Sequence, residues 1–179
     1  MSHVFEPAPT GRAKCRGCAQ PIGKADLRFG ERIPNPFGDG EATLWFHPRC
    51  AAHKRPEPLL EALPTAPADL PDRGGLQRIA TVAAAHRRLP RIDGAERASS
   101  SQAKCRSCRA PIVRGEWRIK LAFYEDGRFT SGGFVHLVCR EVYFETSEVL
   151  EALLQFSHID DPEREALLRA YAEPAVKPQ

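Results

Sequence analysis

All six cysteines and two of the six histidines stand at spacings that suit the binding of a metal ion. Each half of the chain has a Cys-x2-Cys pair, then a long gap, then a His-x2-Cys pair. The residues are Cys15, Cys18, His47 and Cys50 in the first half and Cys105, Cys108, His136 and Cys139 in the second. A Cys-x2-Cys turn presents two thiolates to one tetrahedral metal ion, and a distant second pair closes the shell. The pattern predicts two Zn²⁺ ions as cofactors, each bound by three cysteines and one histidine.

A shell of four protein ligands leaves no position for water, so the zinc is expected to be structural and not catalytic. Three disulfides are the alternative use of six cysteines, but the stretch from Met1 to Arg12 lacks the apolar core of a secretion signal. A disulfide framework also has no use for His47 and His136, which recur at matched spacing. His53 is a rival ligand, but Val142 stands at its place in the second half. We therefore expect zinc and an intracellular, reducing compartment, which is the cytoplasm or nucleoid, or the nucleus in a eukaryote.

The chain repeats itself at an offset near 90 residues, and the candidate ligands belong to this repeat. Several short blocks match, with small shifts in the loops between them. The matching blocks are Cys15-Arg16-Gly17-Cys18 with Cys105-Arg106-Ser107-Cys108, Pro21-Ile22 with Pro111-Ile112, Leu27-Arg28-Phe29 with Trp117-Arg118-Ile119, and Leu60-Glu61-Ala62-Leu63 with Leu150-Glu151-Ala152-Leu153. We interpret the repeat as a duplication and predict two domains, 1–93 and 94–179.

Hydrophobic periodicity places strands between the ligand pairs and helices after them. In the second half, apolar residues alternate with polar ones over 117–123, and Asp126-Gly127 marks the hairpin turn to a returning strand. Helices are expected over 76–89, over 147–156 and from Asp161, which resembles an N-cap. The proline-rich segment 56–71 is expected to be an extended connector, and 91–102 a flexible linker. The predicted fold class is α+β: two small zinc-stabilised modules, each a short antiparallel sheet with a Cys3His site followed by helices.

Composition and charge exclude several classes of protein. No apolar run approaches the roughly 20 residues that a membrane helix needs. The chain has no Gly-rich phosphate-binding loop, nucleophile elbow or cofactor fingerprint, so it is expected not to be an enzyme and to have no small-molecule substrate. The net charge is only +3, but 10–33 and 102–120 each contain six basic side chains. Such stretches could bind a polyanion, although a solvated surface is the plainer reading.

These motifs resemble the zinc fingers of poly(ADP-ribose) polymerases and of some DNA ligases and DNA end-processing phosphatases. The resemblance covers about 10–52 and 100–141. Its first stretch begins Gly11-Arg12-Ala13-Lys14-Cys15-Arg16-Gly17-Cys18, continues through Asp26-Leu27-Arg28 and closes with Trp45-Phe46-His47-Pro48-Arg49-Cys50. LIM fingers share the ligand order but usually have a shorter gap between the pairs. Tandem fingers strengthen the resemblance, because the polymerases have two such fingers in series.

The resemblance implies binding to a nick, gap or end in DNA, and therefore a role in DNA damage or repair. Phosphate contacts carry no sequence information, and stacking on an exposed base tolerates any base. By position, Arg12, Arg28 and Arg118 resemble the backbone-gripping arginines of the family, and Phe37 and Phe129 lie in the loops that press on exposed bases. Further phosphate contacts are expected on charge grounds alone at Lys14, Arg16, Lys104, Arg106 and Arg109.

The second repeat departs from the family pattern at one position, and the predicted DNA-contacting residues also have structural alternatives. Gln102 stands where Arg12 stands in the first repeat, so the second finger is expected to grip phosphate less well. Arg28 and Arg118 could instead be the solvated face of a strand, and Phe37 could close a small core.

The predicted function is that of a non-enzymatic protein that recognises DNA strand breaks. Its predicted partners are broken DNA and a DNA repair enzyme such as a ligase or nuclease, with no membrane. A LIM-like, zinc-stabilised adaptor for protein interactions is the alternative, with the helices as its docking surface. A binder of single-stranded nucleic acid is a third reading, and a zinc enzyme is the least favoured because the ligand shell is full.

Overall fold

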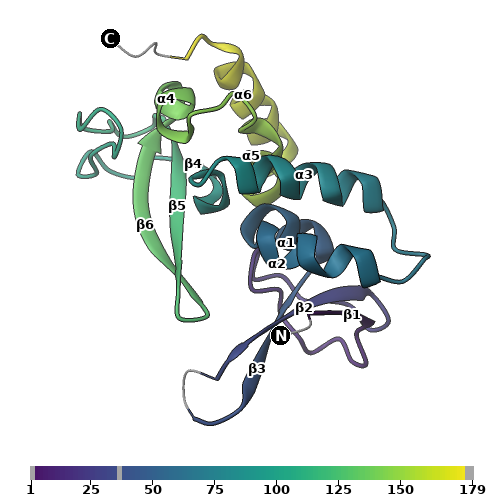
Figure 1. Ribbon diagram of the computed structural model, residues 1–179. Coiled ribbons are helices and arrows are strands. Elements are labelled where there is room, and N and C mark those ends of the chain that lie inside the picture. Colours follow the sequence, from purple (N-terminus) through teal and green to yellow (C-terminus); the bar gives the residue numbers. More distant parts are fainter. Residues whose placement is uncertain (1–2, 36–37, 176–179) are drawn as a thin grey trace. The chain divides into compact units, whose positions relative to one another are not determined.

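The computed structural model describes residues 3–35 and 38–175 of the chain and has two three-stranded sheets, each followed by helices (Figure 1). The first sheet has the order β1–β2–β3, formed by Val4–Pro7, Leu27–Pro34 and Glu41–Phe46. The second has the order β4–β5–β6, formed by Ile92–Arg97, Trp117–Glu125 and Arg128–His136. The α-helices are α1 Pro48–Lys54, α2 Pro56–Ala62, α3 Arg73–Ala85, α4 Arg140–Phe144, α5 Leu150–Phe156 and α6 Asp161–Ala172. The predicted α+β fold class is confirmed.

The chain forms two compact units, and their limits differ from those of the duplicated sequence. The first unit comprises Met1–Ala85 and Tyr124–Phe129, and the second comprises His86–Phe123 and Thr130–Gln179. The segment 86–93 thus lies with the second unit, because β4 starts at Ile92 and pairs with β5. The hairpin tip between β5 and β6 lies with the first unit. The domains 1–93 and 94–179 remain a prediction about the duplication.

Apolar residues of the strands and helices form the core of each unit. In the first unit, the buried side chains include Phe29 of β2, Phe46 of β3 and Leu59 of α2. The second unit buries Ile119 of β5 and Leu153 of α5 in the same way. Each small core thus lies between one sheet and short helices, and the two cores together include four of the predicted zinc ligands, Cys15, Cys50, Cys105 and Cys139.

The hairpin turn at Asp126-Gly127 is confirmed. Both residues have positive φ, 48° and 75°. A turn with two such residues matches the right-handed twist of the strands that it joins, and glycine adopts this conformation without steric cost. The turn brings β6 back along β5 to His136.

Three predictions of local structure are wrong in detail. The expected connector 56–71 begins with helix α2, because Pro56 stands in the first turn, where its missing N–H costs nothing. The expected linker 91–102 begins with strand β4, which pairs with β5. The N-cap of α6 is Asp160 and not Asp161, since the Asp160 carboxylate accepts a hydrogen bond from the Glu163 backbone N–H at 3.0 Å.

No helix in the part of the chain that the structure describes is long and apolar enough to cross a membrane.

Candidate metal centres and nucleic-acid interface

The first candidate metal centre joins a turn, the end of a strand and the start of a helix. Cys15 and Cys18 come from the Cys-x2-Cys turn, His47 directly follows β3, and Cys50 lies in the first turn of α1. The ligand atoms of all four residues lie within 4.8 Å of one another. The His47 Nδ1 atom is 3.4 Å from Cys18 Sγ and 3.9 Å from Cys50 Sγ. A tetrahedron with zinc–ligand bonds of about 2.3 Å to sulfur and about 2.0 Å to nitrogen has edges of this length.

The second centre repeats this geometry with Cys105, Cys108, His136 and Cys139. His136 Nδ1 is 3.4 Å from Cys108 Sγ and 4.0 Å from Cys139 Sγ. The other ring nitrogen of His136, Nε2, lies 3.1 Å from the Pro111 carbonyl oxygen, to which an N–H at this position donates. That hydrogen bond leaves Nδ1 as the metal-binding nitrogen, as an outer-shell partner commonly does. The eight predicted ligands therefore come together in two Cys3His groups.

The protonation of the cysteines fits a divalent cation. A hydrogen bond from Cys18 lowers the pKa of Cys15 to about 3, with help from Cys50, while a hydrogen bond to Cys15 raises the pKa of Cys50. In the second centre, burial raises the pKa of Cys139 to about 12. Without metal, thiolates and thiols in one cluster must share protons. A Zn²⁺ ion would take the place of those protons, and its four bonds would fill each shell.

Zinc uptake is expected to release protons. At pH 7, Cys50 and Cys139 hold their protons because the pKa of each lies above its ordinary value, and a free cysteine in an unfolded chain also holds its proton. Only the thiolate binds zinc, so at least about one proton must leave for each ion bound. Titration of metal-free protein with zinc in weak buffer containing a pH indicator should show acidification that saturates at two ions per chain. Zinc uptake without acidification would contradict Cys3His ligation.

Two arginines predicted to contact DNA are buried in their own units. Arg28 and Arg118 are each only 7% exposed. The Arg28 guanidinium forms an ion pair with Glu6 and lies 3.5 Å above the centroid of the Trp45 ring. Neither Arg28 nor Arg118 is therefore the solvated strand face that the sequence allowed.

Arg118 is held in the same way as Arg28, which makes the arrangement a property of the repeat. Its Nη2 atom lies 2.6 Å from Glu96 Oε1, and its guanidinium lies 3.6 Å above the Phe134 ring. Each glutamate stands directly opposite its arginine in the strand register. The sequence pattern alone did not predict a role for Glu6 and Glu96. Their 90-residue separation, which equals that of Arg28 and Arg118, is the signal that could have paired them.

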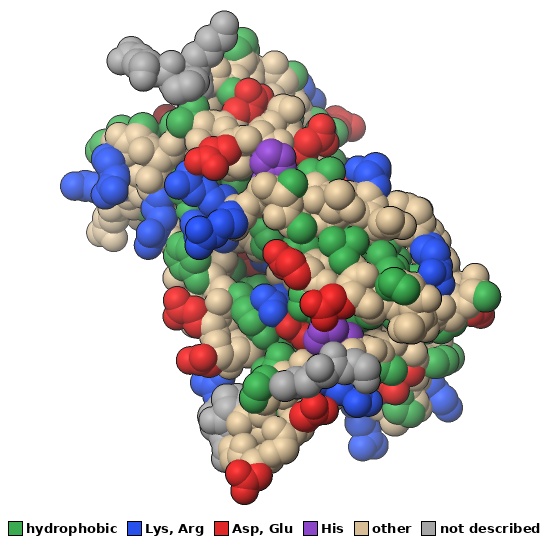
Figure 2. Space-filling model, viewed as in Figure 1, with side chains coloured by type: hydrophobic (Ala, Val, Ile, Leu, Met, Phe, Trp, Pro, Cys, Tyr) green, Lys and Arg blue, Asp and Glu red, His purple; other side chains and the backbone are tan. Residues whose placement is uncertain are grey.

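The other predicted phosphate contacts lie at the surface. They are Arg12, Lys14 and Arg16 around the first Cys-x2-Cys turn and Lys104, Arg106 and Arg109 around the second, and all six are exposed. The backbone N–H of Arg16 donates to the Trp45 carbonyl at 2.9 Å, and that of Arg106 donates to Phe134 at the same distance. These bonds fix each turn to the strand that ends at the ligand histidine. Figure 2 shows Lys and Arg side chains gathered on the second unit, over the loops before β5 and the neighbouring end of its sheet.

Of the two predicted stacking residues, the structure describes only Phe129. Phe37 lies outside the described residues. Phe129 is half-buried in the first unit, where its ring contacts Phe46 edge-on at 6.4 Å and Tyr124 at 5.0 Å between centroids. The Arg55 guanidinium lies 3.7 Å above the Tyr124 ring. Phe129 is thus held by aromatic neighbours of its own unit, and its contact with a base stays a prediction.

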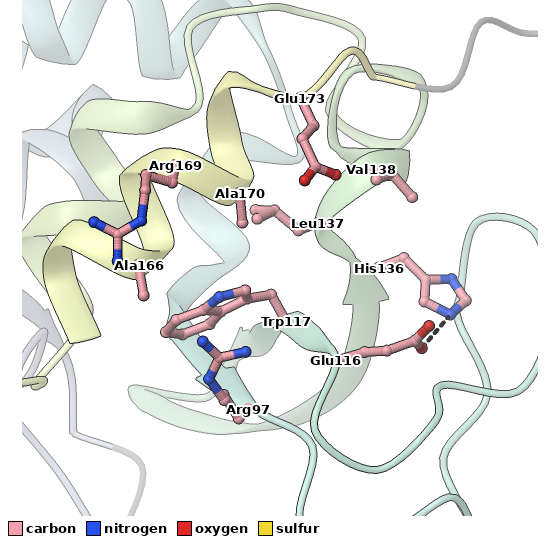
Figure 3. A pocket seen from close by; sticks show the side chains of 10 residues that line it. All are labelled: Arg97, Glu116, Trp117, His136, Leu137, Val138, Ala166, Arg169, Ala170 and Glu173. Atoms are coloured by element: carbon pink, nitrogen blue, oxygen red, sulfur yellow. Dashed lines mark ion pairs between the residues drawn. The ribbon is translucent and has the colours of Figure 1, made fainter. Parts of the chain in front are cut away.

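A cavity of about 510 Å³ lies beside the second metal centre (Figure 3). Its wall includes Trp117, with the guanidinium of Arg97 4.5 Å from the indole centroid, and Ala166 and Ala170 of α6. Arg169, Glu116 and Glu173 add charges of both signs. This mixed lining does not favour an anion over a cation, so the cavity is a weaker candidate for phosphate than the exposed turns.

The first repeat is similar to a known family of zinc fingers. Residues 6–71 match the model of the poly(ADP-ribose) polymerase and DNA-ligase Zn-finger region. This segment matches the poly(ADP-ribose) polymerase-type zinc-finger family. The match confirms the resemblance found in the sequence of the first repeat. It includes all four ligands of the first metal centre and both Glu6 and Arg28.

Complete poly(ADP-ribose) polymerases are similar to most of this chain. A fruit fly (Drosophila melanogaster) polymerase is 26% identical over 139 residues, 70% of this chain, and a rice (Oryza sativa) polymerase 1 is 28% identical over 141 residues, 74% of this chain. The chain spans only about 14% of the length of these relatives. The similarity thus concerns a small part of each polymerase.

Proposed function

We propose that this protein binds DNA at strand breaks and has no enzymatic activity of its own. The observation that carries the proposal is the match of residues 6–71 to a poly(ADP-ribose) polymerase-type finger whose four metal ligands converge in the structure. Because the chain spans about 14% of its polymerase relatives, we assign it none of their catalytic activity. A protein of this kind would mark or protect a break, or recruit a repair enzyme to it, in a reducing compartment that keeps its cysteines reduced for zinc binding.

Exposed cations on the two Cys-x2-Cys turns supply the proposed phosphate contacts. In the first finger these are Arg12, Lys14 and Arg16, whose turn is fixed by the zinc centre and by the bond from Arg16 to Trp45. Contacts of this type position a protein on DNA without reading its sequence. The proposed stacking loop of the first finger contains Phe37. Stacking on a terminal base pair is available at a nick or end and not in a closed duplex, so it would supply the preference for breaks.

Binding to nicked and intact DNA is the decisive measurement. Nicked, gapped and blunt duplexes, single strands, and intact closed circles should be compared in a titration over about 50 to 200 mM salt. A break-binding protein prefers the discontinuous duplexes, and its affinity falls as salt rises because phosphate contacts release counterions. Equal affinity for closed and nicked circles would rule out break recognition. Absence of binding to every DNA would favour a protein-interaction adaptor.

Neutralising the first turn is expected to weaken DNA binding without loss of zinc. The double variant Arg12→Gln/Arg16→Gln removes two exposed charges, and we expect about tenfold weaker binding to nicked DNA and a salt slope smaller by about 1 to 2. Arg164→Gln is the matched control, because it removes an exposed charge that belongs to α6 and to neither turn. Equal binding by the double variant and the control would exclude the first turn from the interface.

A further inference from the structure

Two arginines of the second unit lie against one aromatic ring. The guanidinium carbon of Arg91, which directly precedes β4, is 4.9 Å from the centroid of the Phe123 ring. That of Arg106, in the second Cys-x2-Cys turn, is 5.3 Å from the same centroid. Both distances fall within the about 6 Å over which a cation is attracted to an aromatic face. Three segments that are distant in sequence therefore bring two positive charges to one ring.

No carboxylate of the described residues neutralises either of these guanidinium groups. Arg91 donates from Nη1 to the Tyr143 hydroxyl at 3.4 Å, and none of the ion pairs found between described residues includes Arg91 or Arg106. Arg118 in the same unit differs, because Glu96 holds it. Two like charges held near one ring repel each other, and an anion bound beside both would offset that repulsion.

The neighbouring strand is shaped to receive the ring and one guanidinium. A Cβ atom at Gly132 of β6 would lie 2.7 Å from Cε2 of Phe123, and one at Gly133 would lie 3.0 Å from Nε of Arg106. Gly133 also has a φ of +88°, a conformation that other residues rarely adopt. Two successive glycines therefore leave the space that the Phe123 ring and the Arg106 side chain occupy.

Phosphate is the anion that this arrangement suits best. Arg106 is exposed, and Arg91 and Phe123 are half-buried, so solvent reaches the cluster. A guanidinium has five N–H donors, and its planar fork matches the oxygens of a phosphate. Stacking on the ring restricts each guanidinium in advance, which reduces the entropy that binding must spend.

The first repeat cannot form the same cluster. It has Arg16 at the position of Arg106, but Ile33 stands where the second repeat has Phe123. The second repeat in turn has Gln102 at the position of Arg12 and holds Arg118 in an ion pair. It therefore lacks an arginine at one place where the family grips phosphate and has this cluster instead.

We propose that Arg91, Phe123 and Arg106 form a phosphate-binding site of the second unit, which holds a phosphate group of a DNA strand. The proposal rests on the proposed function, because it places one contact of the DNA-bound protein. The phosphate is either a terminal group at the break or an internal phosphodiester.

The test compares full-length variants on nicked duplexes with a 5′-phosphate or a 5′-hydroxyl at the nick. Arg91→Gln/Arg106→Gln removes both charges, and we expect about tenfold or greater loss of affinity and a salt slope smaller by about 1. The single variant Arg106→Gln changes only an exposed side chain and should lose about threefold to tenfold. A larger loss with the 5′-phosphate nick identifies the terminal group, and an equal loss on both identifies an internal phosphodiester.

Controls separate this site from the proposed function. Each variant must retain two zinc ions per chain and an unchanged melting temperature, and Arg164→Gln should bind as the original protein does. If the double variant melts early, the single variant Arg106→Gln decides the matter alone. If the original protein prefers nicked DNA but Arg106→Gln binds it equally well, the site is wrong and the function stands. If the original protein has no preference for nicked DNA, the proposed function itself fails.

Discussion

Replacing Cys15 by serine is expected to leave one zinc ion per chain instead of two and to unfold the first finger. Cys15 is 1% exposed, and its Sγ accepts a hydrogen bond from the His47 backbone N–H at 3.3 Å. Structural zinc contributes about 10 to 16 kcal/mol of apparent binding free energy, which is coupled to folding. A domain of this size has only about 5 to 15 kcal/mol of stability, so the finger cannot lose the metal and remain folded.

Elemental analysis and amide hydrogen exchange measure this outcome together. The exchange of β2 and β3 amides should become fast in Cys15→Ser, while β5 amides of the second unit retain protection. His158→Asn is the control, because His158 is exposed and belongs to neither metal centre. Retention of two zinc ions by Cys15→Ser, or of slow exchange in β2, would contradict the assigned ligand set.

Replacing Glu96 by glutamine is expected to lower the free energy of unfolding by about 2 to 3 kcal/mol. The substitution leaves Arg118, which is 7% exposed, without a charged partner above the Phe134 ring. Breaking a buried ion pair on one side costs about 3 to 5 kcal/mol. The Glu96 side chain is 35% exposed, so water screens part of the interaction and lowers the expected cost to about 2 to 3 kcal/mol.

Urea denaturation at constant zinc concentration measures this change. Arg169→Gln provides the comparison, since it breaks an ion pair with Glu165 in which both side chains are more than 70% exposed. Such a pair contributes about 0.3 to 0.5 kcal/mol, so the denaturation midpoint should hardly move. Equal midpoints for the two variants would mean that Glu96 does not hold Arg118, and that Arg118 is free to contact DNA as the family resemblance implies.

The metal centres were predictable because the information for them is local and repeated. A Cys-x2-Cys turn and a His-x2-Cys pair each restrict two ligands to one end of a short segment, and the duplication excluded His53 as a ligand. The alternation of apolar residues over 117–123 predicted β5 in the same way, since one face of a strand must meet the core. The Asp126-Gly127 turn could be predicted from these two residues alone.

The environments of Arg28 and Arg118 could be predicted only with knowledge of which strands pair. A basic residue in an alternating strand looks the same whether its side chain meets solvent or a carboxylate on the neighbouring strand. Glu6 is 22 residues from Arg28 in sequence, and only the β1–β2 register brings them opposite each other. The same pairing explains why 91–102 is not a free linker, because Ile92–Arg97 completes the second sheet as an edge strand.

Local spacing therefore determined the zinc ligands, the fold class and the hairpin turn, because these depend on residues a few positions apart and on a copied pattern. Tertiary structure alone decided which cations remain free: it buries Arg28 and Arg118 against glutamates and brings Arg91 and Arg106 to the Phe123 ring. The reason is that a charge acts on whatever lies within a few ångströms of it, and those neighbours come from distant parts of the chain.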